Sequence, residues 1–99
     1  MLREGGKSAA GPADVLAPPA GIVAEEMEDE LLLHRPDTGK TVYLNGTAAL
    51  VWRLLDGERS GAEIAAMLAD AYPEAADRIH GDTARTLAEF VERGIAERR

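Results

Sequence analysis

The second half of this chain is divided into helices by explicit start and stop signals, and these signals constrain the fold more than any other feature. Ser60 and Glu63 form a Ser-x-x-Glu capping box, in which each side chain accepts a hydrogen bond from the other residue's free amide. Pro73 prevents the helix from continuing past Tyr72. Between these signals, apolar residues recur at helical spacing: Ile64, Met67, Leu68, Ala71 and Tyr72. The sequence therefore predicts an amphipathic helix over about residues 60–72.

A second helix is predicted before this one. Its apolar positions follow the i, i+3, i+4, i+7 pattern, at Ala48, Val51, Trp52 and Leu55. We expect the side-chain oxygen of Asn45 to accept hydrogen bonds from the free amides at its start, and Asp56-Gly57 to end it. Trp52 lies on the apolar stripe, so it is expected to fill the core.

A third helix is predicted from about Ala75 to Arg93, because Gly94 is well placed to end it. One side of this helix carries Ile79, Thr83, Thr86, Leu87, Phe90 and Val91, and Phe90 is expected in the core. Gly81 lies in the first half of the helix, where it weakens helix formation by roughly 1 kcal/mol relative to Ala.

The first half of the chain carries the pattern of three short strands. Ile22-Val23-Ala24 and Leu31-Leu32-Leu33 flank an acidic stretch, residues 25–30, which we interpret as the charged turn of a hairpin. Pro36-Asp37-Thr38-Gly39 places Pro and Gly where a second turn needs them, and the β-favouring residues 41–44 follow. The predicted fold class is α+β: a winged-helix-like, three-stranded antiparallel sheet followed by a three-helix bundle.

A chain of 99 residues holds one domain with one modest core. Residues 1–20 are rich in Gly, Ala and Pro and have no helical or strand periodicity, so we predict a flexible tail there. Residues 21–99 are predicted to form the domain. This size leaves little room for a separate catalytic domain and favours a binding module.

The charge balance and the residue content exclude several classes of partner. Lys and Arg number 11 against 18 for Asp and Glu, and the net charge of −7 repels a phosphate backbone, so nucleic acid is disfavoured. No apolar run approaches the roughly 18 residues of a membrane span, and no secretory signal opens the chain. There is no cysteine, which fits a reducing compartment, so a cytoplasmic location is expected.

Residues with catalytic or metal-binding chemistry are scattered. His34 and His80 lie in different elements and have no second ligand at metal-binding spacing. The acidic stretch at residues 25–30 lacks the pattern of a calcium loop, and no glycine cluster matches a phosphate-binding loop. Ser60 already has a structural role in the capping box, and no nucleophile has a base near it in the sequence. We therefore expect no metal, no cofactor and no enzymatic activity.

The third strand offers a different kind of chemistry. The predicted sheet is too small to cover both of its edges, and a helix follows the strand at once. An exposed strand edge can pair with another extended chain through its main-chain amides and carbonyls. The peptide-binding residues predicted on this strand are therefore Thr41, Val42, Tyr43 and Leu44.

The segment Tyr43-Leu44-Asn45-Gly46-Thr47-Ala48-Ala49-Leu50-Val51-Trp52-Arg53-Leu54-Leu55-Asp56-Gly57 resembles the PqqD family, peptide chaperones of PQQ biosynthesis, and related precursor-peptide recognition elements. Its Leu-Asn-x-Thr-Ala, Trp and Leu-x-Asp-Gly follow the family pattern. The likeness continues through Ser60 to Ile64 and Tyr72-Pro73 and ends at Phe90 to Ile95, so it covers roughly residues 22–97. Thr83 departs from the family, which usually has an aliphatic residue there.

The resemblance implies a function and a site. It implies that the third strand accepts the leader region of a ribosomally synthesised and modified peptide, in PQQ or another such pathway, with leader side chains lying between this strand and the third helix. On that helix, Asp82, Thr86, Glu89 and Arg93 follow one stripe, of which we assign the first three to the binding wall, and Arg78 and Arg85 lie further round, where they can pair with leader acids.

The implied partners are the precursor peptide and a modifying enzyme, such as a radical SAM protein, a peptidase or a cyclase, without nucleic acid or membrane. An alternative is a winged-helix regulator that binds DNA. It depends only on the order of the helices and the arginines of the third helix, and the net negative charge of the chain disfavours it.

Overall fold

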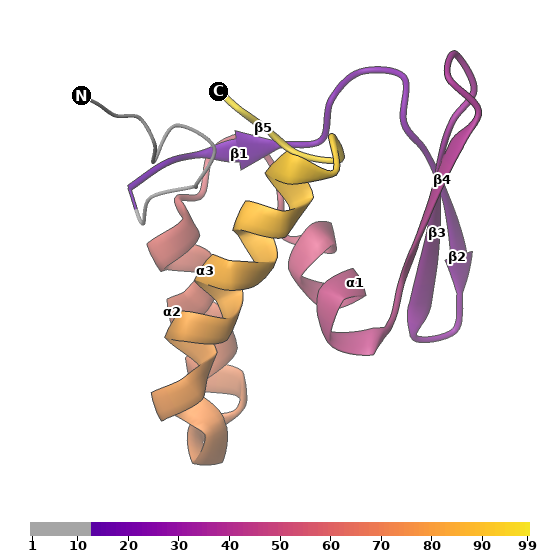
Figure 1. The fold of residues 1–99 in the computed structure, drawn as a ribbon. Coiled ribbons are helices and arrows are strands. Elements are labelled where there is room, and N and C mark those ends of the chain that lie inside the picture. Colours follow the sequence, from indigo (N-terminus) through magenta and orange to yellow (C-terminus); the bar gives the residue numbers. More distant parts are fainter. Residues whose placement is uncertain (1–12) are drawn as a thin grey trace.

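A computed structural model describes residues 13–99 (Figure 1). Its main sheet has three antiparallel strands in the order β2 (Val23–Met27), β3 (Glu30–Arg35) and β4 (Lys40–Leu44). In the register of β3 and β4, Leu33 lies opposite Val42 and Leu32 lies opposite Tyr43. β3 is central, so β2 and β4 form the two edges of this sheet.

Alternation along the strands gives the sheet one apolar face. Leu31 and Leu33 of β3 and Val42 and Leu44 of β4 are buried, whereas Tyr43 on the opposite face is half exposed. The predicted acidic turn is shorter than expected. Glu25 and Glu26 pair with β3 inside β2, and the turn is reduced to residues 28–29, because Glu28 adopts the left-handed conformation (φ 46°) that a tight connection needs.

Three helices follow the sheet: α1 (Gly46–Arg53), α2 (Gly61–Ala71) and α3 (Ala76–Glu92), with a 3₁₀ turn η2 (Pro73–Ala75) between the last two. The capping box of α2 is confirmed. The Ser60 hydroxyl accepts from the Glu63 amide at 3.1 Å, and the Glu63 carboxylate accepts from the Ser60 amide at 2.8 Å. The α+β order of strands and helices predicted from the sequence is therefore correct.

The cap predicted for α1 was wrong in its chemistry. Asn45 occupies the N-cap position, but its side chain makes no capping hydrogen bond, and only its carbonyl accepts, from the Ala49 amide at 2.7 Å. The helix also ends at Arg53, before the predicted Asp56-Gly57. Instead, the Asp56 carboxylate accepts from the amides of Glu58 and Arg59, both at 2.9 Å. These hydrogen bonds lower the pKa of Asp56 and order the loop that leads to α2.

The tail prediction is wrong for residues 16–17. Leu16 and Ala17 form strand β1, which pairs with β5 (Glu97–Arg98) in a second, two-stranded sheet, and the two strands lie side by side at the end of the helices in Figure 1. Leu16 is only 1% exposed, so the core includes part of the predicted tail. Periodicity could not reveal a two-residue strand whose partner is 80 residues away. The predicted tail's residues 1–12 lie outside the described part of the chain.

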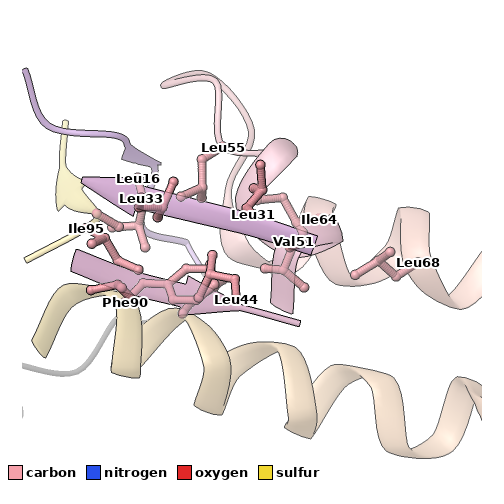
Figure 2. Close-up of a cluster of buried hydrophobic side chains, with 14 residues drawn as sticks. Leu16, Leu31, Leu33, Leu44, Val51, Leu55, Ile64, Leu68, Phe90 and Ile95 are labelled. Atoms are coloured by element: carbon pink, nitrogen blue, oxygen red, sulfur yellow. The ribbon is translucent and has the colours of Figure 1, made fainter. Parts of the chain in front are cut away.

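The core lies between the apolar face of the sheet and the three helices, with α1 placed between the sheet and the α2–α3 pair in Figure 1. Figure 2 shows that it joins side chains from every layer, as the labelled residues illustrate: Leu16, Leu31, Leu33, Leu44, Val51, Leu55, Ile64, Leu68, Phe90 and Ile95. Phe90 is 2% exposed, which confirms its predicted core position. Trp52 is half-buried and packs against this cluster.

The C-terminal end of α3 is a Schellman motif. The amide of Ile95 donates to the carbonyl of Phe90 at 3.0 Å, and the amide of Gly94 donates to that of Val91 at 3.1 Å. Gly94 makes this reversal possible because it adopts a φ of 75°, which costs a residue with a Cβ about 1–2 kcal/mol. The motif turns the carbonyls of residues 93–95 away from the helix.

Three side chains from three other elements donate to these carbonyls. Lys40 Nζ of β4 donates to the carbonyl of Arg93, Arg35 Nη1 of β3 to that of Gly94, and Trp52 Nε1 of α1 to that of Ile95, each at 2.9 Å. Cations suit this position because a helix C-terminus carries a partial negative charge. We call these three hydrogen bonds the α3 anchor, since they fix the end of α3 to the sheet and to α1.

Replacing Trp52 by Phe tests the α3 anchor. The change removes the donor to the carbonyl of Ile95 and part of a packed ring, so we expect the free energy of unfolding to fall by about 1–3 kcal/mol in urea denaturation followed by circular dichroism. The control is Tyr72→Phe, which alters an exposed ring and is expected to stay within about 0.5 kcal/mol of the wild type. Equal stability of the two variants would contradict the anchor.

Gly81→Ala is expected to stabilise the domain. Gly81 is exposed within α3, and a Cβ built there meets no atom within 4 Å, so the change improves helix propensity without a clash. We expect a gain of about 0.5–1 kcal/mol in the same denaturation experiment. Gly94→Ala is the matched control with the opposite sign, because its positive φ makes the same substitution cost about 1–2 kcal/mol. A loss of stability in Gly81→Ala would be inconsistent with a regular helix at this position.

Candidate functional site

A groove of about 290 Å³ lies between β4 and α3. Its lining comes from the end of β4, from α1 and from the C-terminal half of α3: Tyr43, Leu44, Asn45, Ala48, Thr86, Glu89, Phe90 and Arg93. We call it the β4–α3 groove. Its wall and its strand are tied together at one end, because the α3 anchor joins Lys40, the first residue of β4, to Arg93.

The edge of β4 that borders this groove is open. In residues 13–99, β4 pairs with β3 on one side, and no strand pairs with its other side. Backbone amides and carbonyls on such an edge can form a ladder with an added chain. The predicted strand edge without a pairing partner, next to the third helix, is therefore present in the structure.

The groove has an apolar floor and a polar rim. Phe90 and Leu44 are buried, at 2% and 4% exposure, and Ala48 is half-buried beside them. Glu89 and Arg93 are exposed and lie one helical turn apart on the wall. An extended peptide can bury apolar side chains on this floor while its polar side chains meet the rim.

Tyr43 is held on the outer face of the sheet. Its hydroxyl donates to the carboxylate of Glu30, and this hydrogen bond raises the pKa of Tyr43 above its usual value. Tyr43 and Glu30 come from neighbouring strands and lie diagonally across the sheet.

The other edge of the sheet is built differently. β2 carries exposed carboxylates, and its Glu26 accepts two hydrogen bonds from the Arg53 guanidinium of α1, at 2.6 and 3.5 Å. The guanidinium lowers the pKa of Glu26, so this carboxylate stays ionised. Charged side chains along an edge strand discourage the addition of another strand. The structure therefore favours β4 over β2 as the docking edge.

A larger cleft of about 910 Å³ lies beside the groove, between α1 and the α2–α3 pair. Thr86 lines both cavities. The side chain of Thr83, which departs from the family pattern, lines the cleft and is only 4% exposed.

The structure divides the predicted site residues into three groups. Tyr43, Leu44, Thr86 and Glu89 line the β4–α3 groove. Arg78 and Asp82 line the larger cleft together with Thr86. Thr41, Val42 and Arg85 line neither cavity: the side chain of Val42 is buried in the core, Thr41 Oγ1 lies 3.2 Å from His34 Nδ1, and Arg85 forms an ion pair with Asp82.

Four residues of the groove were missing from the predicted site: Asn45, Ala48, Phe90 and Arg93. Arg93 belongs to the same predicted helical stripe as Glu89, so the 3.6-residue repeat contained the signal. Asn45 was assigned to a helix cap, and Ala48 and Phe90 to apolar helix faces. Their apolar character does not distinguish the middle of a core from the floor of a groove.

The described residues hold neither a metal centre nor a membrane span. No group of three or more His, Asp or Glu side chains in residues 13–99 is arranged to hold a metal ion. Over the same range, no helix combines the length and the apolar character needed to cross a bilayer.

The family model "Coenzyme PQQ synthesis protein D (PqqD)" matches residues 30–96, which is more than half of the chain. The chain belongs to the PqqD family. The matched range begins at β3 and includes β4 and all three helices, so both sides of the β4–α3 groove lie within the family domain. No curated protein matches the chain.

Two solved structures are similar to this PqqD-family domain. One is the PqqD truncation of Methylobacterium extorquens PqqCD, described as a functional, stand-alone RiPP recognition element (RiPP: ribosomally synthesized and post-translationally modified peptide). It is 26% identical, with a TM-score of 0.75, and the match covers 95% of this chain and 100% of that one. The other is TbiB1 in complex with the TbiA(beta) leader peptide, 20% identical, with a TM-score of 0.71 and coverage of 82% and 94%. At this identity, the TbiB1 structure shows that the two chains share a fold.

Proposed function

We propose that this chain captures the leader region of a ribosomally synthesised precursor peptide by strand addition to β4. The observation that carries the proposal is the open edge of β4 beside a groove with an apolar floor. The leader peptide complex of TbiB1 and the recognition element of M. extorquens support it, because both share this fold.

The energetics of the groove suit reversible capture. Each main-chain hydrogen bond to β4 contributes roughly 1 kcal/mol net, and two apolar side chains on the floor contribute about 1.5–3 kcal/mol each. Association and ordering of the peptide cost about 4–15 kcal/mol. Because these contributions and this cost are of similar size, weak and reversible binding is expected. This affinity allows the peptide to be released once an enzyme has acted on it.

The captured peptide is presented to a modifying enzyme. A leader held in the β4–α3 groove leaves the rest of the precursor outside the domain, where an enzyme can reach it. Membership of the PqqD family supports a partner in the synthesis of coenzyme PQQ or of another modified peptide. Radical SAM proteins, peptidases and cyclases are the classes of partner that we propose.

A DNA-binding function has little support. None of the matching descriptions mentions DNA. On α3, Arg85 pairs with Asp82, and the acidic residues Asp82 and Glu89 lie among the arginines on the same side of the helix, so these arginines form no continuous basic face. The net charge of −7 adds a long-range repulsion from phosphates.

Thr86→Trp tests docking against the α3 wall, which borders both the groove and the larger cleft. Thr86 is half-buried on the α3 wall, so a larger side chain there occupies the space that an added strand needs. We expect at least tenfold weaker binding of a fluorescein-labelled leader peptide, taken from the precursor gene next to the gene for this chain, in a fluorescence-polarisation titration. Such a loss corresponds to about 1.4 kcal/mol or more.

Ala84→Trp is the matched control for this experiment. Ala84 is exposed on α3 and lines neither cavity, so it receives the same side chain without blocking the groove. We expect it to bind as the wild type does. Equal binding by Thr86→Trp and wild type would exclude the groove as the docking site, and no binding by the wild type would contradict the proposed function.

A further inference from the structure

Two opposite charges on the rim of the β4–α3 groove have no partner. Among residues 13–99, neither Glu89 nor Arg93 takes part in an ion pair or a side-chain hydrogen bond, although Arg85 and Asp82 on the same helix pair with each other. Lys40, a cation at this end of the groove, is engaged with the carbonyl of Arg93. The carboxylate and the guanidinium are therefore available to a ligand in the groove.

The spacing of these two charges matches the repeat of an extended chain. Arg93 is the C-cap residue of α3, four residues after Glu89, and a rise of about 1.5 Å per residue separates them by roughly 6 Å along the helix axis. In a β-strand, residues i and i+2 point to the same side and are about 6.6 Å apart. Two side chains on the same side of a bound strand can therefore face Glu89 and Arg93 together.

The direction of the bound strand follows from the anchor. Lys40 at the start of β4 contacts Arg93 at the end of α3, whereas Leu44 at the end of β4 shares the groove with Thr86, so β4 and α3 run in opposite directions. The sheet is entirely antiparallel, and antiparallel pairing is the more stable kind. A strand added antiparallel to β4 runs parallel to α3 and passes Glu89 before Arg93.

We propose that the groove selects peptide segments in which a basic residue precedes an acidic residue by two positions, with the basic side chain facing Glu89 and the acidic one facing Arg93. This inference rests on the proposed function and adds a rule for which leaders bind. The opposite order places like charges together at both positions, so the rim rejects such segments as well as attracting the favoured ones. The guanidinium of Arg93 can also bind a carboxylate through two parallel hydrogen bonds.

The overall charge of the domain does not favour the acidic residue of the proposed pair. A net charge of −7 attracts basic peptides without regard to their register. A preference for a carboxylate at one defined position therefore has to come from a local cation, and Arg93 is the unpaired cation on the wall of the groove. Selection for the acidic residue is thus the more informative half of the test.

The probe is an mRNA-displayed library of random 12-residue peptides, selected on the full chain. We expect the wild type to enrich Lys or Arg two positions before Asp or Glu. The doubly reversed variant, Glu89→Arg with Arg93→Glu, has the same net charge and is expected to enrich the opposite order. Glu92→Arg is the control, because Glu92 is exposed on α3 and lies outside both cavities, and it is expected to keep the preference of the wild type.

Fluorescence polarisation then compares one enriched peptide with an isomer in which its two charges are exchanged. We expect the wild type to prefer the enriched peptide about tenfold at low salt, the doubly reversed variant to prefer the isomer, and both preferences to shrink in 0.5 M NaCl. The isomers have equal charge and composition, so a difference between them reports position alone.

The outcomes separate this inference from the function on which it rests. Enriched peptides that lose binding in Thr86→Trp but show no order of charges would overturn the charge rule and leave leader capture intact. An unchanged preference in the doubly reversed variant would overturn it in the same way. If no enriched peptide depends on Thr86, both the rule and the proposed groove are wrong.

Discussion

The α3 anchor is the interaction on which the rest of this structure depends. A Schellman motif turns three carbonyls out of the helix end, and a lysine, an arginine and a tryptophan from β4, β3 and α1 donate to them. The hydrogen bonds of Arg35 and Trp52 are half-buried, and a half-buried carbonyl is costly when it is left without a donor, so these two disfavour displacement of the helix. The anchor thereby sets the distance between the wall of the groove and its strand.

This arrangement also explains why a binding edge survives in so small a domain. The other edge strands differ from β4: β5 is part of a separate sheet with β1, and β2 carries charges that discourage pairing. α3 lies beside the β4 edge and does not cover it, because its C-terminus is tied to the start of the strand while Thr86 and Glu89 line the groove further along. Within residues 13–99, the open edge of β4 therefore lies beside a groove with an apolar floor, which suits a partner that arrives as an extended chain.

The sequence predicted the elements well where a local signal existed. The capping box of α2, the Gly94 stop of α3 and the strand at residues 40–44 depend on neighbours in the chain, and all three are present. The errors lie where a local preference did not decide the structure. Asn45 occupies the cap position without capping, and Glu25 and Glu26 lie within β2, because strand pairing with β3 overrides the preference of acidic residues for turns.

The sequence by itself determined the fold class, the family and the position of the edge strand β4, since capping, turn chemistry and apolar spacing act over a few residues. Only the tertiary structure decided which side chains meet across the groove. It placed Arg93 and Ala48 in the groove, Val42 in the core and Leu16 inside a predicted tail. These outcomes depend on contacts between segments far apart in the chain, such as Lys40 with Arg93 and Leu16 with Arg98, and such contacts leave no periodic trace in the residues that make them.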